Sequence, residues 1–595
     1  MKRALFLAVA LLLSAPLGAQ DADAPPVAVT YTLDVSQPKS GEAKVEMVVE
    51  NNRDDEVTLG LPVWEPGRYR VTPFHLGIKG LEAEISGKKV EVAATDHKSL
   101  WKVKTDKAGK FKVRYTIKPG DVPQYRDMLN EDHYDLLGPS AWLYIKDRMN
   151  GPHKVSFRLP SGWRVGTGLK KSKLGSGYEA PDYDTFADCP IELGKFALHT
   201  FESDGVDYEI VVHAPEEYAA PKLIDIHKRI VAEQTRIFGG APFDRYVFLY
   251  HFRKSYGGEG LEHLNSTRIV FAMAAVKADP VNIASMTSHE FFHLWNVKRI
   301  RPKELGPFDY TQPVRSKALW LSEGVTSYYG DLTLVRAGVW SHDVYLRHLA
   351  SEITQLQGNP ARKTQTVEDA SWTVWDRPRG ERSTAVDYYN KGELLGWLID
   401  LKIRHATGGK KSLDDVMRHL YRVGVAEPSK AGKGPIGVGF DEKGILAAVN
   451  EVSGQDFTKF FKDYISGLEE LPYLEVAQLA GLTVIRQKGL GVVLRDMKVV
   501  FDPPKESEAD KAGLKKGDEI IRINETPVGQ GVQLSKVLDP FKFGEIVTVL
   551  VNREKEKAPI KIELPVVEGS FALSVSAEST PEQSSLLKGW LSSPK

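Results

Sequence analysis

Alternation of apolar and polar residues dominates the first third of the chain. Residues 29–33 (VTYTL), 44–48 (KVEMV) and 112–117 (KVRYTI) place every second side chain on the same face, and turn residues separate these runs. A period of two is typical of half-buried β-strands. The pattern therefore predicts a β-sandwich-like N-terminal domain over residues 21–215.

A helical period replaces the alternation in the middle of the chain. Helices are predicted from Pro280 through His289 to Arg299, from Ser316 to Arg336, and from Asp387 to His405, where Gly408 and Gly409 follow. Ser412 with Asp415 three residues later is typical of a capping box at the start of a fourth helix. We expect a mainly helical domain over residues 216–475.

Short strands around one helix return near the C-terminus. Residues 489–492 (GLGV) open a strand, and residues 512–524 have a turn-then-strand order. Both features are typical of a PDZ domain, here 480–568, in which the backbone of Leu490, Gly491 and Val492 would bind a peptide's terminal carboxylate. The alternative is a structural module whose groove never binds. Residues 569–595, rich in Ser, Pro, Glu and Lys, are expected to form a flexible tail. The predicted fold class is thus multidomain α+β.

Composition narrows the possible partners and the compartment. Lys+Arg and Asp+Glu both total 79, so no net charge favours nucleic acid, and a single cysteine excludes an intramolecular disulfide. Residues 1–20 combine a basic start, an apolar run and small residues, which is typical of a secretory signal peptide. We expect export, to a bacterial periplasm, and no membrane span in the mature chain.

The candidate chemistry begins with the pentapeptide HEFFH at residues 289–293. On a helix, a spacing of four puts His289 and His293 on one face, where both can bind one Zn²⁺. Glu290 beside them can take a proton from water at the metal. The alternative is an ordinary amphipathic helix with two histidines.

A two-histidine zinc site needs a third protein ligand. Glu323 lies on the next predicted helix, thirty residues beyond His293, and a loop between the helices can bring it to the pair. Alone, Glu323 would be a solvated helical glutamate.

Two further segments suggest how a peptide would be held. Residues 257–263 (GGEGLEH) approach a predicted edge strand, 267–271, to which a peptide could add through Gly260 and Leu261, with Glu262 facing its ammonium group. Tyr389, in the DYYNKG segment 387–392, could stabilise an oxyanion. The plainer alternatives are a hairpin loop and a packing tyrosine.

Several segments together resemble the glycyl aminopeptidase family, a gluzincin branch of zinc peptidases with a C-terminal PDZ domain. They are residues 289–302 (HEFFHLWNVKRIRP), 323–332 (EGVTSYYGDL), 260–263 (GLEH), 387–392 (DYYNKG), 62–69 (PVWEPGRY) and 188–192 (DCPIE). The resemblance implies a β-rich N-terminal domain, a thermolysin-like catalytic domain, and removal of N-terminal residues, often Gly or Ala, from peptides with a free N-terminus.

The resemblance also assigns roles. It implies one Zn²⁺ per chain bound by His289, His293 and Glu323, with Glu290 as general base. Glu262 is similar to the amine-binding glutamate of the G-x-M-E-N motif, although this chain has GLEH, and Tyr389 is similar to the oxyanion-stabilising tyrosine.

Two other functions remain open from the sequence. One is a zinc endopeptidase with the same site and no contact to a substrate amine. The other is a PDZ-led peptide-binding or quality-control protein whose metal is only structural, although such a metal would not require an acid at Glu290.

Overall fold

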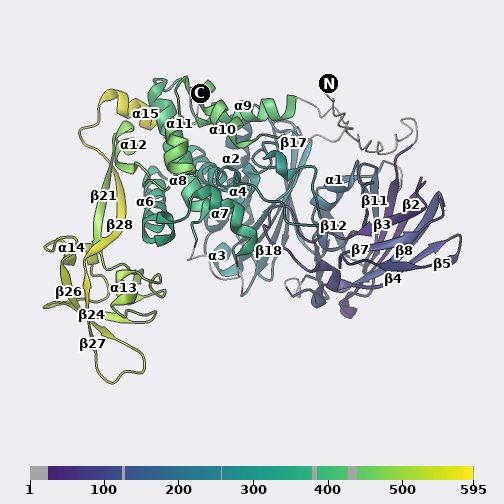
Figure 1. Cartoon of the computed structure of the whole chain (residues 1–595), viewed down its shortest axis with the longest axis horizontal. Helices are drawn as coiled ribbons and strands as arrows, with labels where there is room; N and C mark the ends of the chain where they lie inside the picture. The colour runs from purple at the N-terminus through teal and green to yellow at the C-terminus, as the bar shows by residue number, and fades with distance from the viewer. Residues whose placement is uncertain are drawn as a thin grey trace, which may run out of the picture.

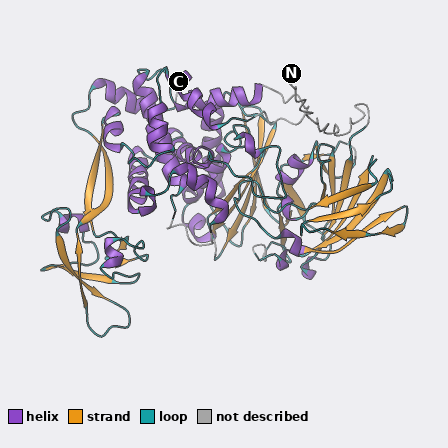
Figure 2. Cartoon of the chain, viewed as in Figure 1, coloured by secondary structure: helices purple, strands orange, loops and turns teal. Residues whose placement is uncertain are grey.

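The computed structural model of the chain describes residues 25–123, 128–173, 175–255, 257–377, 385–426 and 439–593. Three parts follow one another along its longest axis: a β-rich part, a mainly helical part, and a small β domain on a two-stranded ribbon (Figures 1 and 2). The predicted α+β multidomain fold class is confirmed. The predicted signal peptide, residues 1–20, lies outside the described residues.

The described residues of the N-terminal part form three sheets and one short α-helix, α1 (Tyr183–Asp188). The largest sheet has the order β13 (Lys170–Lys171), β14 (Tyr178–Ala180), β11 (His153–Arg158), β1 (Ala28–Asp34), β2 (Ala43–Glu50), β8 (Lys110–Ile117), β4 (Ile78–Ile85), β5 (Lys88–Val90). The others have the orders β10 (Tyr144–Ile145), β3 (Glu56–Gly60), β7 (Leu100–Lys104), β6 (Val92–Ala94) and β12 (Arg164–Thr167), β15 (Ile191–Gly194), β9 (His133–Leu136). Alternate residues of β1 and β2 are buried, as the pattern predicts.

The boundary of this part lies earlier than the predicted residue 215. Strands β16 (Ala197–Ser203) and β17 (Val206–His213) belong to a five-stranded sheet of the central part, in the order β16-β17-β18-β20-β19. Its other strands are β18 (Arg245–Arg253), β19 (Glu259–Glu262) and β20 (Ser266–Ala272). The prediction was wrong here because alternation identifies a strand but not the sheet that it joins; β17 pairs with β18 in parallel.

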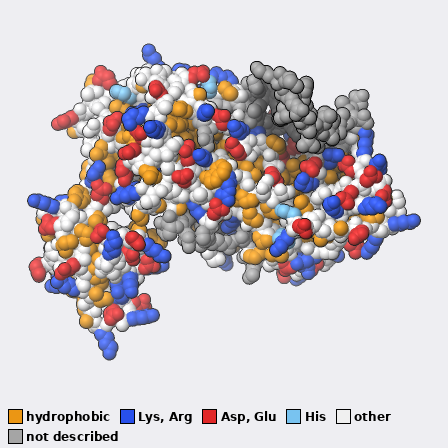
Figure 3. Space-filling model, viewed as in Figure 1, with side chains coloured by type: hydrophobic (Ala, Val, Ile, Leu, Met, Phe, Trp, Pro, Cys, Tyr) orange, Lys and Arg blue, Asp and Glu red, His pale blue; other side chains and the backbone are white. Residues whose placement is uncertain are grey.

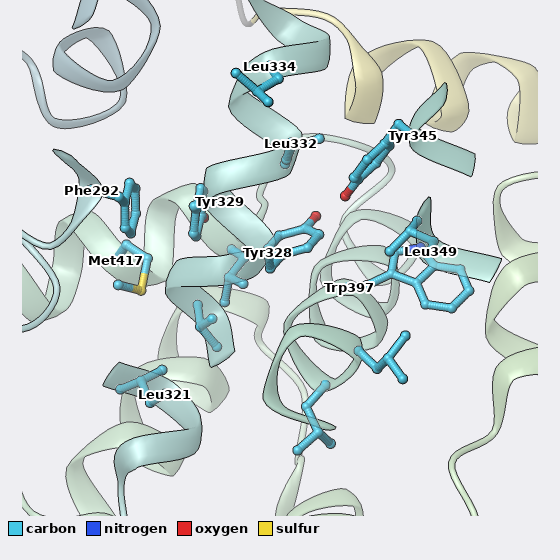
Figure 4. Packing of buried hydrophobic residues seen from close by; sticks show 14 of the residues in the cluster. Phe292, Leu321, Tyr328, Tyr329, Leu332, Leu334, Tyr345, Leu349, Trp397 and Met417 are labelled. Atoms are coloured by element: carbon cyan, nitrogen blue, oxygen red, sulfur yellow. The ribbon is translucent and has the colours of Figure 1, made fainter. Parts of the chain in front are cut away.

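Helices pack on this sheet and on one another to form the central part. They are α2 (Ala220–Phe238), α3 (Met273–Ala278), α4 (Ala284–Phe292), α5 (Thr326–Arg336), α6 (His342–Gly358), α7 (Val367–Trp372), α8 (Tyr388–Ala406), α9 (Leu413–Ala426), α10 (Glu442–Ser453), α11 (Thr458–Phe460) and α12 (Tyr473–Leu479). Figure 4 shows large side chains of α4, α5, α6 and α8, among them Phe292, Tyr328, Leu349 and Trp397, filling the space between the helices.

The predicted helices differ from the observed ones mainly at their ends. The first is shorter than expected, since α4 ends at Phe292 and the chain turns from His293 onward, where the carbonyl of Asn296 bonds the His293 ring. The second begins with a π-helical turn, Trp320–Val325, before α5. The third is confirmed as α8, and the backbone N–H of Ser412 donates to Asp415 at the start of α9.

In the sequence, the C-terminal β domain is inserted between two long strands that pair with each other. Strand β21 (Leu482–Gly489) pairs antiparallel with β28 (Val567–Val575), and these strands form the ribbon seen in Figure 1. The domain contains β22 (Leu494–Arg495), β23 (Lys498–Val499), α13 (Glu508–Lys511), β24 (Glu519–Ile523), β25 (Thr526–Pro527), α14 (Leu534–Leu538), β26 (Ile546–Asn552) and β27 (Ile560–Pro565). Its hydrophobic core is separate from that of the central part.

The predicted flexible tail, residues 569–595, is instead ordered over its described residues. After β28 the chain forms α15 (Pro581–Leu591), which begins with a complete capping box of Thr580 and Gln583. Trp590 is fully buried between α5 and α8, and its Nε1 donates to the Tyr328 hydroxyl at 2.8 Å. The prediction was wrong because it rested on the polar composition of the segment, whereas a few apolar residues are enough to give a short helix one apolar face.

Charges are mixed on the surface. On the face shown in Figure 3, acidic and basic side chains are interspersed over all three parts, in keeping with the neutral net charge. None of the helices in the described ranges combines the length and apolar character that crossing a bilayer requires.

Candidate metal centre

His289, His293 and Glu323 converge as the sequence predicts. The Nε2 atoms of the two imidazoles lie 3.0 Å apart, and Glu323 Oε2 lies 3.6 Å from His289 Nε2 and 3.2 Å from His293 Nε2. His293 and Glu323 are buried, whereas the His289 side chain is slightly exposed. Three ligand atoms thus face one point that opens on one side.

Two glycines allow the helices to approach closely enough for this arrangement. A Cβ atom on Gly324 would lie 2.4 Å from the Cα of Gly392 in α8, and a Cβ on Gly330 would lie 3.2 Å from the Cα of His289. Glycine therefore allows the turn that carries Glu323 to approach α8, and α5 to approach α4.

Hydrogen bonds fix the orientation of both imidazoles. His293 Nδ1 donates to the carbonyl of Asn296 at 2.7 Å. Ser327 Oγ donates to the carbonyl of Glu323, so its oxygen accepts from His289 Nδ1 at 3.2 Å. Each ring then presents the Nε2 lone pair to Glu323, which is the arrangement of metal-binding histidines.

A tyrosine from the N-terminal domain positions Glu323, and sequence reasoning did not find its role. The Tyr69 hydroxyl donates to Glu323 Oε1 at 2.5 Å. This contact leaves Oε2 directed at the imidazoles. The only signal in the sequence was the segment 62–69, which resembled the family without indicating that Tyr69 reaches a residue 254 positions away.

Glu290 lies beside the ligands in a buried position. Its Oε2 has no hydrogen-bond partner within the described ranges, and its side chain packs against the backbone of Gly260, where a Cβ would lie 1.9 Å from Oε1. Burial raises the pKa of Glu290 well above its usual range, and the charges of Glu262 and Glu323 add to this against the opposing effect of His293. The carboxyl group therefore accepts a proton readily.

Glu262 faces the same space from strand β19. Ligand atoms of Glu262, Glu290 and His293 lie within 4.8 Å of one another, and Glu262 Oε1 has no hydrogen-bond partner among the residues described. Gly67 of the N-terminal domain leaves room for this carboxylate, since a Cβ there would lie 2.3 Å from Oε2. Glu262 is thus available to a bound cation.

The predicted peptide-binding strand requires two corrections. The edge of the five-stranded sheet is β19 itself, residues 259–262, whereas segment 267–271 lies inside the sheet between β18 and β19. Leu261 points away from the site into the hydrophobic core of the N-terminal domain, because successive strand residues face opposite sides. Gly260 and Glu262 face the site.

Tyr389 lies at the first turn of α8, where Asp387 caps the helix by accepting from the Tyr389 backbone N–H at 2.9 Å. Its half-buried ring stacks on His289 with centroids 6.0 Å apart. Burial, followed by the charge of Glu323, raises the pKa of Tyr389 well above its usual range, so the phenol remains protonated and can donate a hydrogen bond.

The charges and donors of this cluster fit a divalent cation. The Nε2 atoms of two imidazoles and a Glu323 carboxylate oxygen face one another, while Glu262 and Glu290 add buried acidic groups. Although burial opposes a charge on His293, the carboxylates of Glu323 and Glu262 raise its pKa to about 10. Two nitrogen ligands and one oxygen ligand with an open side are the donor set of a catalytic zinc site.

A small apolar cavity adjoins Glu262 at the junction of the two domains. Its volume is about 40 Å³, and its walls include Trp64, Gly67, Val297, Leu305 and Phe308. The sequence did not indicate these wall residues, since they come from distant segments.

The predicted carboxylate loop of the C-terminal domain lies between β21 and β22. Gly491 has a φ of 72°, which favours glycine, while Leu490 is buried in the domain core and Val492 packs against it. The loop is far from the metal centre along the chain and belongs to the separate domain.

Comparisons with known proteins identify the domains. A model described as M61 glycyl aminopeptidase matches residues 282–395, one described as the peptidase M61 N-terminal domain matches residues 30–195, and a PDZ-domain model matches residues 481–564. The predicted presence of a β-rich N-terminal domain and of a C-terminal PDZ domain is therefore confirmed. Curated proteins gave no match.

Solved structures show a similar fold. The crystal structure of an aminopeptidase N family protein from Idiomarina loihiensis has a TM-score of 0.79 at 24% identity, covering 95% of this chain and 100% of that chain. An M1 zinc metallopeptidase from Deinococcus radiodurans has a TM-score of 0.46 at 14% identity, covering 76% of this chain and 95% of that chain. The first of these supports the whole architecture, including the mainly helical central domain.

Proposed function

Since the chain belongs to the M61 glycyl aminopeptidase family of peptidases, we propose that it is a zinc-dependent aminopeptidase that removes small residues, Gly or Ala, from peptide N-termini. The observation that carries this proposal is the convergence of His289, His293 and Glu323 with two further buried carboxylates, Glu290 and Glu262, that have free oxygen atoms.

The ligands proposed for the zinc ion are His289, His293 and Glu323. When bound, zinc acts as a Lewis acid on the scissile carbonyl and lowers the pKa of water toward neutrality. Glu290 takes the proton of the attacking water, because its burial makes the neutral carboxyl group favourable. It then gives that proton to the leaving amine.

Tyr389 and Tyr69 have separate roles in this scheme. The Tyr389 phenol, protonated and stacked on His289, donates a hydrogen bond to the developing oxyanion. Tyr69 acts on Glu323 alone and keeps one of its oxygen atoms directed at the imidazoles. Tyr69 is therefore a positioning residue.

Glu262 provides the preference for a free N-terminus. Its free Oε1 can accept a charge-assisted hydrogen bond from the substrate ammonium group, and β19 offers a backbone edge for the following residues. The cavity beside Glu262 has bulky side chains in its walls, among them Trp64, Leu305 and Phe308, which would favour a small first side chain. This size argument supports Gly or Ala as the first residue.

We also propose a cellular location for the protein and a ligand for its PDZ domain. Residues 1–20 would direct export to a periplasm, where the enzyme would meet peptides. The loop at Leu490, Gly491 and Val492 would bind the C-terminal carboxylate of a peptide or tethered protein, separately from the catalytic site.

Zinc content tests the ligand assignment. We expect one zinc ion at the catalytic site of the wild type and loss of that ion in His293→Ala, because two remaining protein ligands cannot hold zinc tightly. Metal analysis after dialysis measures this, with circular dichroism as the fold control. If His293→Ala retained as much zinc as the wild type, the assignment would be refuted.

Substrate selectivity tests the role of Glu262. The wild type should prefer a peptide with a free N-terminus over its acetylated form by about ten- to over a hundredfold, corresponding to about 1.5 to 3 kcal/mol for a charge-assisted hydrogen bond. Glu262→Gln should lose most of this preference while still cleaving both peptides. Equal cleavage of both peptides by the wild type would instead favour the endopeptidase alternative.

A further inference from the structure

A second group of metal-ligating side chains lies outside the catalytic cluster, where α5, α6 and α8 meet. His348 Nε2 of α6 lies 2.8 Å from Asp331 Oδ2 of α5 and 2.9 Å from Glu393 Oε1 of α8. Asp331 and Glu393 are buried, and the His348 side chain is one-quarter exposed. One ligand atom from each of three helices thus surrounds the proton on His348 Nε2. The partly exposed ring of His348 connects this group to solvent.

The group contains more acidic than basic side chains. Among the described residues, neither Asp331 nor Glu393 forms an ion pair with Lys or Arg. Glu352, one turn after His348 on α6, adds a third carboxylate, which accepts from Asn390 Nδ2 at 2.6 Å. One imidazole therefore faces three acidic side chains, and a divalent cation would balance them better than one proton does.

Two buried polar atoms beside the group are also unsatisfied. Asp331 Oδ1 and the Tyr345 hydroxyl have no hydrogen-bond partner in the described part of the chain, although both residues are more than nine-tenths buried. In Figure 4 the Tyr345 hydroxyl points inward toward α5, and the charges of Glu393 and Asp331 act on this phenol. Unsatisfied buried polar atoms are uncommon and often mark an ion or water site.

Another cluster, at the junction of the N-terminal and central domains, is less suited to a metal. It contains Asp135, Glu192 and His251, but Arg268 Nε bonds both oxygens of Asp135 at 2.8 and 3.0 Å. A guanidinium thus already supplies the positive charge there. The group on α5, α6 and α8 has no such cation among its described partners.

We propose that Asp331, His348 and Glu393 bind a second divalent transition-metal ion, Zn²⁺ in the first instance, separate from the catalytic site. Ligands 2.0 to 2.2 Å from a tetrahedral zinc ion lie roughly 3.3 Å apart. The observed separations of 2.8 and 2.9 Å would need to increase by only about half an ångström.

The ion would link the helices that carry the active site. Glu323 precedes α5 directly and Tyr389 begins α8, while α6 supplies His348. Replacing the imidazole proton by a metal would join these three helices through coordinate bonds. The second ion would thus be structural, and its loss would lower the stability of the protein without removing a catalytic group.

Metal stoichiometry of single and double variants tests this site. The full-length protein is equilibrated with excess Zn²⁺ and dialysed to remove unbound metal, and bound zinc is measured by mass spectrometry. We expect two zinc ions in the wild type, one in His348→Gln, one in His293→Ala and none in the double variant. His348→Gln should retain turnover within a few-fold of wild type, and its thermal midpoint should rise less on adding zinc than that of the wild type, because only the catalytic site remains to be filled.

The outcomes separate this inference from the proposed function. Loss of one ion in His348→Gln with no loss in His293→Ala would support the second site and refute the catalytic assignment. One ion in the wild type and none in His293→Ala would overturn the second site. Glu393→Gln replaces His348→Gln if the latter fails to fold, and anomalous diffraction at the zinc edge of wild-type crystals decides the matter without any variant.

Discussion

Replacing Glu290 with glutamine is expected to reduce turnover by about 10²- to 10⁴-fold, the usual cost of removing a general base. The amide has nearly the same shape as the carboxyl group but cannot accept a proton from water. Since Glu290 Oε2 has no hydrogen-bond partner among the described residues, glutamine at this position breaks no hydrogen bond of that atom and should not destabilise the fold. The zinc ligands are unchanged, so metal binding should persist.

The measurement is kcat on a small peptide with a free N-terminus, together with zinc content and the thermal midpoint. Glu217→Gln, at an exposed glutamate of the same domain, is the matched control and should resemble the wild type. Activity of Glu290→Gln within a few-fold of wild type, at equal zinc content, would show that another group takes the proton.

Replacing Trp590 with alanine is expected to lower the free energy of unfolding by about 3 to 5 kcal/mol, the usual cost of removing a fully buried large aromatic side chain. Trp590 contacts the rings of Tyr345 and Trp397 at centroid distances of 5.6 and 6.4 Å and donates to the Tyr328 hydroxyl. The substitution would leave a cavity between α5 and α8 and remove the hydrogen bond that the Tyr328 hydroxyl accepts, although this hydroxyl would still donate to Asp400 Oδ2.

Urea denaturation monitored by circular dichroism measures the loss. Trp372→Ala, at a tryptophan whose surface is 43% exposed, is the matched control and should change the free energy of unfolding by less than about 1 kcal/mol. Equal effects of the two substitutions would mean that α15 does not contribute to the stability of the central domain.

The position of α15 also determines how the PDZ domain can be removed. A deletion of everything after Ala480 would remove Trp590 and should destabilise the catalytic domain. A deletion of residues 490–566 would retain α15 and both ribbon strands, whose ends are adjacent because Gly489 pairs with Val567. This second deletion, closed by a short turn, is the one suited to testing whether small substrates need the PDZ domain.

Site residues that depend on local spacing could be predicted from the amino-acid sequence alone. A spacing of four residues from His289 to His293 puts both imidazoles on one side of a helical turn, and this holds although α4 ends at Phe292. Glu290 and Glu323 could be found because a zinc site requires a base and a third ligand nearby. Strands and helices could be predicted because the apolar positions of neighbouring residues repeat with a period of two in strands and of about 3.6 in helices.

Contacts between segments that are distant in the sequence became known only from the tertiary structure. Tyr69 reaches Glu323 across the domain junction, Leu261 faces the N-terminal core while Glu262 faces the site, and β17 joins the sheet of the central domain. Trp590 follows the PDZ domain in the sequence, yet it packs on α8 of the central domain. Such contacts depend on long-range strand pairing and on the fit of side-chain shapes, which no local pattern of apolar and polar residues specifies.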